Sequence, residues 1–487
     1  LGTIAVAAQP DRAAAVQSAF LWAFNEYQST AWASDEISPI SGEPRTEFGG
    51  MGATLVDSLD TLWFMGLHRQ FDEAAEWIFR SFSADKNWNG SVFEVTIRYI
   101  GGFLAAYDLS GNQGFIDVAV RVAERLLPAF QCEGGLAKTT VNLASGHVSN
   151  PSWNGGQCVL SEFGSLLLEW RTLSRVSGDD RFRAHVDAIY YTLSNVTEER
   201  QSALLPAYWD CRTGKPSNAH VTFGAWGDSY FEYLVKQWHL SGGKDDRARE
   251  LFSQVVDEIR DRMIQSTPDG RYTYIAELRN GVAQPKVDEL TCFLGGSLTM
   301  TGRPEDLELA TRLGRTCYAF FNQSKTGLAG EIYRFPPGSN TFEWQAGHNL
   351  LRPETVETLF YLTRATGNDE FRDMAWDIFL AFNRSSRVAH GFSGVRDVNK
   401  VPPVHDNRQE SFFFAETLKY LYLTFAGSDA FDMSAFVLNT EAHPLAVHGG
   451  PADRTGRPSD STFAAVGSAA SGGTRLSHAR EAVLLAT

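Results

Sequence analysis

Seven glycines divide this chain into segments of similar length and similar pattern. The stretch before each glycine is apolar on nearly every helical face, and the stretch after it has the apolar spacing of an amphipathic helix. A glycine fits the left-handed position that ends a helix, and the Asp or Asn that often follows fits the start of the next one. The pattern therefore predicts seven helical hairpins, with their turns at Gly66, Gly111, Gly178, Gly242, Gly302, Gly367 and Gly427.

Buried first helices and amphipathic second helices indicate an all-α (α/α)7 barrel, with the apolar helices inside. We expect one large domain over residues 10–445, with short β-hairpins or loops at its mouth in segments such as 141–157 and 335–348. Residues 1–9 have the composition of the end of a secretory signal, and residues 446–487 are predicted to be a disordered tail. A six-hairpin barrel of the glucoamylase type is the alternative, which the seventh glycine disfavours.

Six carboxylates precede their glycines by 13 to 17 residues, a helical rise of roughly 20–25 Å. Hairpins of one orientation would bring these acids together at one end of the ring. Hydrolysis of a glycosidic bond requires two carboxyl groups, one to protonate the leaving oxygen and one acting on the other face of the sugar. The spacing thus favours a glycoside hydrolase, with candidate acids Glu94, Glu162, Asp228, Glu289, Glu354 and Glu410.

The cations expected near these acids, Arg98 and Arg352, are too few to pair with all of them. Unpaired buried carboxylates repel one another, and a hard divalent ion such as Ca²⁺ would relieve that repulsion. Pro353 suits the first turn of a helix, which would place Glu354 where the helix N-terminus favours negative charge. An ionised Glu354 suits a general base.

The composition excludes several classes of partner. A net charge of −15 argues against nucleic acid, anionic membranes and phosphorylated substrates. No apolar run approaches the ~20 residues of a membrane span. Aromatic residues make up 12% of the chain; most are expected in the core, and some could stack on sugars.

Four Asn-x-Ser/Thr sequons favour the lumen of the secretory pathway or secretion; they begin at Asn89, Asn195, Asn322 and Asn383. The cysteines are Cys132, Cys158, Cys211, Cys292 and Cys317. Their odd number leaves at least one thiol unpaired, and we expect one disulfide with buried free thiols. Spacing does not identify the pair.

Six motifs along residues 10–445 identify a family. They are Leu55-Val-Asp-Ser-Leu-Asp-Thr-Leu62, Phe93-Glu-Val-Thr-Ile-Arg98, Gly227-Asp-Ser-Tyr-Phe-Glu-Tyr233, Leu351-Arg-Pro-Glu-Thr-Val-Glu357, Glu410-Ser-Phe-Phe-Phe-Ala-Glu-Thr-Leu-Lys-Tyr420 and Asn439-Thr-Glu-Ala-His-Pro444. In this order they resemble the glycoside hydrolase family 47, or class I, α-1,2-mannosidases. The chain looks like a divergent, secreted member of the fungal type. The resemblance implies an (α/α)7 barrel plugged by a C-terminal loop and a Ca²⁺-dependent, inverting exo-hydrolase of α-1,2-linked mannose in N-glycans or mannans.

The resemblance also implies roles for individual residues. Glu94 matches the general acid, Glu354 the general base, and Asp228 a third carboxylate that acts as acid or helper. Thr440 matches the residue that gives its carbonyl and hydroxyl oxygens to Ca²⁺. Residues that would hold the waters of the metal or the hydroxyls of the sugar are Glu162, Glu357, Glu416 and Glu441. Residues that match the pocket around the terminal mannose are Arg98, Arg352 and Phe412. Cys292 and Cys317 match the disulfide pair of the family, and the other three cysteines are expected to be free.

Two substrate-binding positions depart from the family. Glu289, in Val287-Asp-Glu289, stands where the family has histidine. Trp226 stands where family members carry Arg or Leu, at a position that influences which linkages are trimmed. A tryptophan offers a flat stacking surface in place of a multidentate donor. The product is therefore left open between mannose and α-1,2-mannobiose.

A second class of function is a mannose-binding quality-control protein of the degradation-enhancing type, with little turnover. The three catalytic carboxylates and the matching cysteine pair favour the hydrolase. We expect a monomer that binds a mannose-containing glycan, with no nucleic acid partner and no membrane span.

Overall fold

The computed structural model describes residues 4–455, and the described residues up to Asp453 belong to one unit. The unit continues past the predicted boundary at residue 445: the His448 amide donates to the Leu240 carbonyl at 2.8 Å. The rest of the predicted tail, from residue 456, lies outside the described residues. So do the first three residues of the predicted segment 1–9; Val6, from its described part, is buried.

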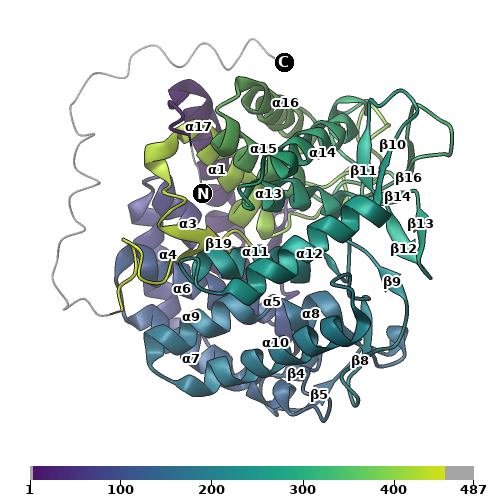
Figure 1. Ribbon diagram of the computed structural model, residues 1–487. Helices are drawn as coiled ribbons and strands as arrows, with labels where there is room; N and C mark the ends of the chain where they lie inside the picture. The colour runs from purple at the N-terminus through teal and green to yellow at the C-terminus, as the bar shows by residue number, and fades with distance from the viewer. Residues whose placement is uncertain (1–3, 456–487) are drawn as a thin grey trace, which may run out of the picture. The chain divides into compact units, whose positions relative to one another are not determined.

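Within residues 4–455, seven inner helices, labelled in Figure 1, form a ring. Each contacts the next along the chain, and the π-helix η5 (Phe413–Thr417), which leads into the last, contacts the first and so closes the ring. The predicted (α/α)7 barrel is confirmed. The inner helices are α3 (Leu59–Phe64), α6 (Gly101–Ser110), α9 (Leu167–Ser177), α11 (Asp228–Leu240), α13 (Phe293–Thr299), α15 (Glu354–Thr366) and α17 (Leu418–Ala426).

An outer layer of seven amphipathic helices covers the ring. It consists of α1 (Pro10–Thr30), α4 (His68–Ser81), α7 (Gly114–Leu126), α10 (Asp180–Arg200), α12 (Asp246–Arg262), α14 (Pro304–Asn322) and α16 (Asp369–Ser385). Shorter elements enter the ring or link its helices: α2 (Ala53–Asp57), α5 (Val92–Glu94), α8 (Leu160–Gly164), the π-helix η1 (Val95–Ile100), and the 3₁₀ turns η2 (Leu127–Phe130), η3 (Ser152–Asn154), η4 (Glu289–Cys292) and η6 (Ser428–Ala430).

Six of the seven predicted glycine turns occur as expected, with φ from 66° to 76° between an inner and an outer helix. Gly427 is the exception, because only the three-residue turn η6 follows it. The partner of α17 is instead α1, from the other end of the chain (Figure 1). The Gln9 amide donates to the Phe425 carbonyl at 2.7 Å. The prediction of a second helix after Gly427 is therefore wrong, but the N-terminal helix completes the seventh hairpin.

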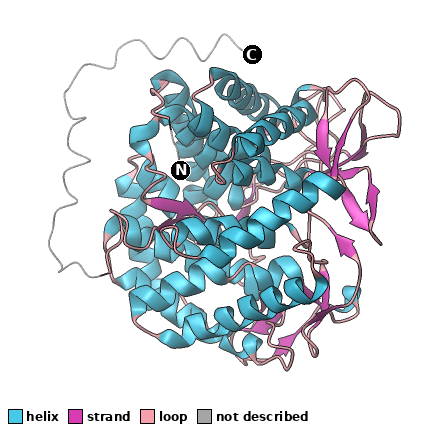
Figure 2. Ribbon diagram, in the orientation of Figure 1, coloured by secondary structure: helices cyan, strands magenta, loops and turns pink. Residues whose placement is uncertain are grey.

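In the part of the chain that the structure describes, short strands form eight small sheets. Most of them lie along one side of the helices (Figure 2). The predicted mouth segments 141–157 and 335–348 contribute to them. The hairpins are β1 (Glu36–Ser38) with β2 (Glu43–Arg45), β10 (Ile264–Ser266) with β11 (Thr273–Ile275), β17 (Arg387–Val388) with β18 (Gly391–Phe392), and β19 (Phe436–Leu438) with β20 (Pro444–Ala446).

The other four sheets have three antiparallel strands each. They are β3 (Asn89–Ser91), β4 (Thr140–Asn142) and β5 (Val148–Ser149); β6 (Cys158–Val159), β7 (Tyr208–Asp210) and β8 (Lys215–Pro216); β9 (His220–Val221), β12 (Glu277–Arg279) and β13 (Val282–Gln284); and β14 (Lys286–Asp288), β15 (Ile332–Arg334) and β16 (Glu343–Ala346).

The hairpin β19–β20 lies inside the ring, where its strands contact α6, α9 and α11. Gly101 and Gly102 of α6 allow this close approach. A Cβ added to Gly101 would lie 2.6 Å from the Asn439 amide nitrogen. The turn of this hairpin therefore forms the floor of the barrel.

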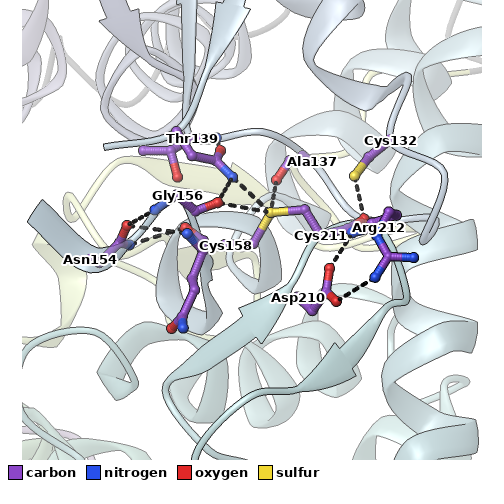
Figure 3. Close-up of a disulfide and its surroundings, with 11 residues drawn as sticks. Cys132, Ala137, Thr139, Asn154, Gly156, Cys158, Asp210, Cys211 and Arg212 are labelled. Atoms are coloured by element: carbon purple, nitrogen blue, oxygen red, sulfur yellow. Dashed lines mark hydrogen bonds and ion pairs between the residues drawn. A yellow bond between two sulfur atoms is a disulfide. The ribbon is translucent and has the colours of Figure 1, made fainter. Parts of the chain in front are cut away.

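Two disulfides are present, Cys292–Cys317 and Cys158–Cys211. The first is the expected pair. The expectation that the other three cysteines are free is wrong for Cys158 and Cys211, which β6 and β7 bring together (Figure 3). Cys132 lies beside this disulfide and is the one free cysteine in the described part of the chain.

Three predicted glycosylation asparagines, Asn89, Asn195 and Asn322, are exposed, and Asn383 is half-buried on α16. Within residues 4–455, no helix has both the length and the apolar composition needed to cross a membrane.

Candidate functional site

A cavity of about 440 Å³ opens inside the ring. The ends of several inner helices meet around it, so residues far apart in sequence share its wall. Twelve of the thirteen predicted catalytic, binding and metal residues line it: Glu94, Arg98, Glu162, Trp226, Asp228, Arg352, Glu354, Glu357, Phe412, Glu416, Thr440 and Glu441. Glu289 is the exception.

The floor of the cavity is the turn between β19 and β20, which the side chain of Asn439 shapes. Its Oδ1 accepts from the amides of Glu441 at 2.9 Å and His443 at 2.8 Å, and its Nδ2 donates to the Ile97 carbonyl at 3.0 Å. All four residues are buried. These bonds fix the backbone that carries Thr440 and Glu441 into the cavity.

Buried ion pairs anchor the same turn to the inner helices. His443 Nδ1 lies 2.8 Å from Asp60 Oδ2, and Lys419 Nζ lies 2.8 Å from Asp60 Oδ1. Lys419 also donates to the Ala442 carbonyl at 2.6 Å. None of the three charged side chains is accessible to solvent. Such charges are tolerated in an apolar ring because each one meets a partner.

Arg98 joins the floor to the wall. Its Nε donates to Glu94 at 2.8 Å, and its Nη1 donates to Asp57 at 3.1 Å and forms an ion pair with Glu441. The guanidinium also lies 5.0 Å from the Phe48 ring centroid. Glu94 and Arg98 face one another because α5 continues into the π-helix η1, a form often found at functional sites.

Lys236 occupies the opposite side of the floor. It forms ion pairs with Glu232 and with Glu357, the latter at 3.5 Å, and donates to the Asn439 carbonyl at 3.2 Å. Tyr420 donates a further hydrogen bond to Glu357 at 3.2 Å. The expectation that Arg98 and Arg352 are the nearby cations is therefore incomplete, since Lys236, Lys419 and Arg408 also neutralise acids of this region.

Acids still exceed cations in the cavity wall, with nine carboxyl groups against three guanidinium groups. Burial raises the pKa of Asp228 and of Glu162 to about 7. Burial and the neighbouring Glu441, Glu354 and Glu357 raise the pKa of Glu416 well above its usual range. Protons on some of these carboxyl groups, or a bound cation, would offset the excess negative charge.

Glu354 has a different environment from the one its helix position predicts. It is the first residue of α15, but burial and the charge of Glu289 raise its pKa well above the ordinary value. The helix N-terminus contributes a fraction of a charge that is outweighed here.

Glu289 lies behind Glu354 and not in the cavity wall. It is 1% exposed, and its Oε1 accepts from Thr355 Oγ1 at 2.7 Å. Burial raises its pKa too, while its hydrogen bond with Glu354 acts in the opposite direction. A hydrogen bond between two carboxyl groups requires a proton on one of them. We therefore interpret Glu289 and Glu354 as a pair that shares one proton. Glu289, which is predicted to bind substrate, does not line the cavity.

Arg352 and Phe412 form one wall of the cavity. The Arg352 guanidinium lies 5.7 Å from the Phe412 ring centroid, and its Nε lies 3.0 Å from Glu331 Oε2. The ring and the guanidinium together offer a flat face beside several polar groups. Such a combination suits the two faces of a sugar.

The sequence analysis missed several residues of the site. Glu232 follows Asp228 by four residues on α11, a spacing that places both on one helix face. Asp57 and His443 occur inside two of the family motifs without an assigned role. Phe48 and Arg408 line the cavity from loops, where no periodicity marks them.

Replacing Arg98 with glutamine is expected to destabilise the protein by about 3–5 kcal/mol, because it leaves buried acids without their cation. Arg69→Gln is the matched control: Arg69 is 69% exposed in its pair with Glu73 and should change stability by less than about 1 kcal/mol. Denaturant unfolding measures both. Equal, small effects would contradict the anchoring role of Arg98.

Comparison with known proteins identifies the family. The model of glycosyl hydrolase family 47 matches residues 19–447. The chain is 41% identical to mannosyl-oligosaccharide 1,2-alpha-mannosidase MNS1 of Arabidopsis thaliana over 89% of this chain and 78% of that protein. It is 40% identical to mannosyl-oligosaccharide 1,2-alpha-mannosidase IB of Mus musculus, over 87% of this chain and 68% of that protein.

A solved structure agrees with these relatives. The alpha-1,2-mannosidase from Trichoderma reesei superposes with a TM-score of 0.85 at 26% identity, covering 91% of this chain and all of that one. Sequence, fold and an acid-lined cavity closed at its floor thus lead to one assignment: the chain belongs to glycosyl hydrolase family 47 and is a glycoside hydrolase.

Proposed function

We propose that this protein is an inverting, exo-acting hydrolase of α-1,2-linked mannosides. The observation that carries this proposal is a cavity with many carboxyl groups that the β19–β20 turn closes at one end. A cavity closed at its floor admits the end of a glycan chain and not its middle. The α-1,2-mannosidases to which the chain is similar support the linkage.

In the proposed mechanism Glu354 is the general base. It would take a proton from a water that attacks the anomeric carbon, while an acid on the other face protonates the glycosidic oxygen. The bond between that carbon and oxygen breaks, giving β-mannose and a shortened glycan. Because Glu354 works only as a carboxylate, the proton that it shares with Glu289 has to leave or stay on Glu289.

Two residues are candidates for the acid. Glu94 holds the position of the family acid, but it is ion-paired with Arg98. The pKa of Asp228, raised by burial to about 7, keeps a substantial protonated fraction near neutral pH. We assign Glu94 as the proton donor on the family motif and Asp228 as the carboxyl group that assists it, for example through a water.

The remaining wall residues would bind the terminal sugar. Phe412 offers a ring face for its apolar side, and Arg352 offers donors to its hydroxyls. The carboxyl groups that would accept hydrogen bonds from sugar hydroxyls or from water are Glu162, Glu357, Glu416 and Glu441.

The residues at the floor fit a Ca²⁺ ion. The excess of acids over cations favours a divalent ion, and hydroxyl and carbonyl oxygens such as those of Thr440 are ligands that Ca²⁺ accepts. In the described part of the chain no three His, Cys, Asp or Glu side chains converge as direct ligands. Thr440 and water would therefore hold the ion, with Glu357, Glu416 and Glu441 around them. When bound, the ion would stabilise negative charge and orient sugar oxygens.

The compartment and the oligomeric state of the protein are also inferred. Two disulfides and several exposed sequons support an oxidising compartment, either the lumen of the secretory pathway or the exterior. We propose that the protein acts as a monomer on a mannose-containing glycan. Because Trp226 is exposed at the cavity, where it could contact a second sugar, mannobiose is an alternative product to mannose.

Removal of Ca²⁺ is expected to lower hydrolysis of an α-1,2-mannobiosyl substrate by about 100-fold, because a bound metal contributes several kcal/mol to transition-state stabilisation. It should also lower the melting temperature, since an ion that binds the folded state stabilises it. Added Ca²⁺ should restore both in the wild type, and Thr440→Val should weaken the restoration. Full activity after complete chelation would contradict the metal role. A wild-type protein that binds the glycan but does not cleave it would favour a quality-control lectin.

Replacing Glu289 with glutamine is expected to move the acidic limb of the pH profile of kcat/KM to lower pH by about one unit. The base acts when ionised, so its activity is lost as pH falls through its raised pKa. Removing the negative charge of Glu289 lowers that pKa. The measurement is kcat/KM against pH for both proteins. Glu308→Gln, at an exposed position of α14, is the control and should leave the profile unchanged. An acidic limb that stays in place would rule out the proton-sharing pair.

A further inference from the structure

Three aromatic rings from separate parts of the chain meet beside the cavity. The Trp153 and Trp226 ring centroids lie 5.7 Å apart, and those of Tyr208 and Trp226 lie 5.6 Å apart. We propose that this aromatic platform (Trp153, Tyr208 and Trp226) is a binding subsite for a hexose on the leaving-group side of the cleaved bond. This inference rests on the proposed function and names residues that bind the substrate beyond its terminal sugar.

The exposure of these rings is unusual for the molecule. The chain contains twelve tryptophans, and among the described residues only Trp153, at 61%, and Trp226, at 40%, are exposed. Scattered exposed apolar residues need no explanation, but two neighbouring tryptophans at the edge of a cavity mark a binding surface. Part of each ring is thus open to solvent in the described structure.

The backbone of Trp226 adopts a conformation that costs conformational free energy. Its φ is 80°, in the left-handed region that side chains other than glycine rarely adopt. The Trp226 carbonyl accepts from the Ser161 amide at 3.1 Å, and the Asp228 amide donates to the Gly224 carbonyl at 3.2 Å. The turn therefore sets the Trp226 ring at the cavity wall, two residues from a catalytic carboxyl group.

The other two rings are also held in place. Tyr208 lies on β7, opposite Val159 of β6, and the Cys158–Cys211 disulfide joins β6 to the residue that follows β7. Trp153 lies in η3, next to Asn154, whose Oδ1 accepts from the Gly156 and Gln157 amides at 3.1 and 3.2 Å. Figure 3 shows Asn154 and Gly156 beside this disulfide. A surface that is fixed before binding loses little entropy when a ligand arrives.

The geometry favours a sugar as the occupant. The planes of Trp153 and Tyr208 are tilted from that of Trp226 by 32° and 41°, so the rings form a shallow, angled surface. A hexose has an apolar face of C–H groups that fits an aromatic ring, and its hydroxyls can remain in water.

The position of the platform next to the cavity indicates which sugar of the glycan it would bind. Trp226 lines the cavity, while Trp153 lies outside its wall. Because the floor closes the other end, a glycan whose terminal sugar is bound inside can leave only through the mouth. The sugars that follow the cleaved bond would then pass over the platform. A longer glycan should therefore bind better than a disaccharide.

The test compares α-1,2-linked mannotetraose with α-1,2-mannobiose, which share the bond to be cleaved. For Trp153→Ala the ratio of kcat/KM between the long and the short substrate should fall roughly tenfold, mainly through KM for the tetrasaccharide. Trp153→Phe should keep most of the ratio. Tyr191→Ala is the matched control, since it removes an aromatic ring that is 65% exposed on the outer helix α10, and it should leave the ratio unchanged.

A ratio that stays within about twofold of wild type in both Trp153→Ala and Trp226→Ala overturns the platform and leaves the proposed function intact. It would indicate another occupant, such as an apolar peptide. A wild-type protein that cleaves neither mannoside overturns the proposed function and the sugar occupant together.

Discussion

The central constraint in this structure is the burial of more carboxyl groups than cations inside an apolar helical ring. Each acid has to be paired with a cation, protonated or bound to a metal ion, because burying an unpaired charge costs free energy. At the floor, ion pairs join Arg98 to Asp57, and Lys419 and His443 to Asp60. In the wall the balance is left incomplete, and that incompleteness provides protonated acids and room for a cation.

The fold allows this arrangement because one set of residues packs the ring and another set lines the cavity. Apolar contacts between inner and outer helices hold the ring, and the pairing of α1 with α17 completes the seventh hairpin. The polar residues of the cavity wall lie in the first turns of inner helices, in the short helices and loops that lead into them, and in the β19–β20 turn. Apolar burial in the ring stabilises the fold and can offset the cost of burying carboxyl groups with raised pKa values in the wall. The mouth hairpins then add the surface that a longer glycan would contact.

Much of this could be predicted from the sequence, where the signal was local or repeated. Six of the seven predicted glycine turns join an inner to an outer helix, and Glu94, Asp228 and Glu354, predicted from their regular position to lie together, line one cavity. What the sequence could not reveal depends on neighbours distant along the chain. The partner of α17 comes from the N-terminus, the Cys158–Cys211 pair depends on two strands meeting, and Glu289 turned out to lie behind Glu354 and to change its proton affinity.

The most direct test of the account is proton NMR of the first minutes of α-1,2-mannobiose hydrolysis. If Glu354 activates a water on the face opposite the protonated oxygen, the mannose released from the non-reducing end appears first as the β anomer and then mutarotates. Early release of α-mannose would mean retention of configuration. Glu354 would then act as a nucleophile or not at all, and the proposed division of roles between the carboxyl groups would be wrong.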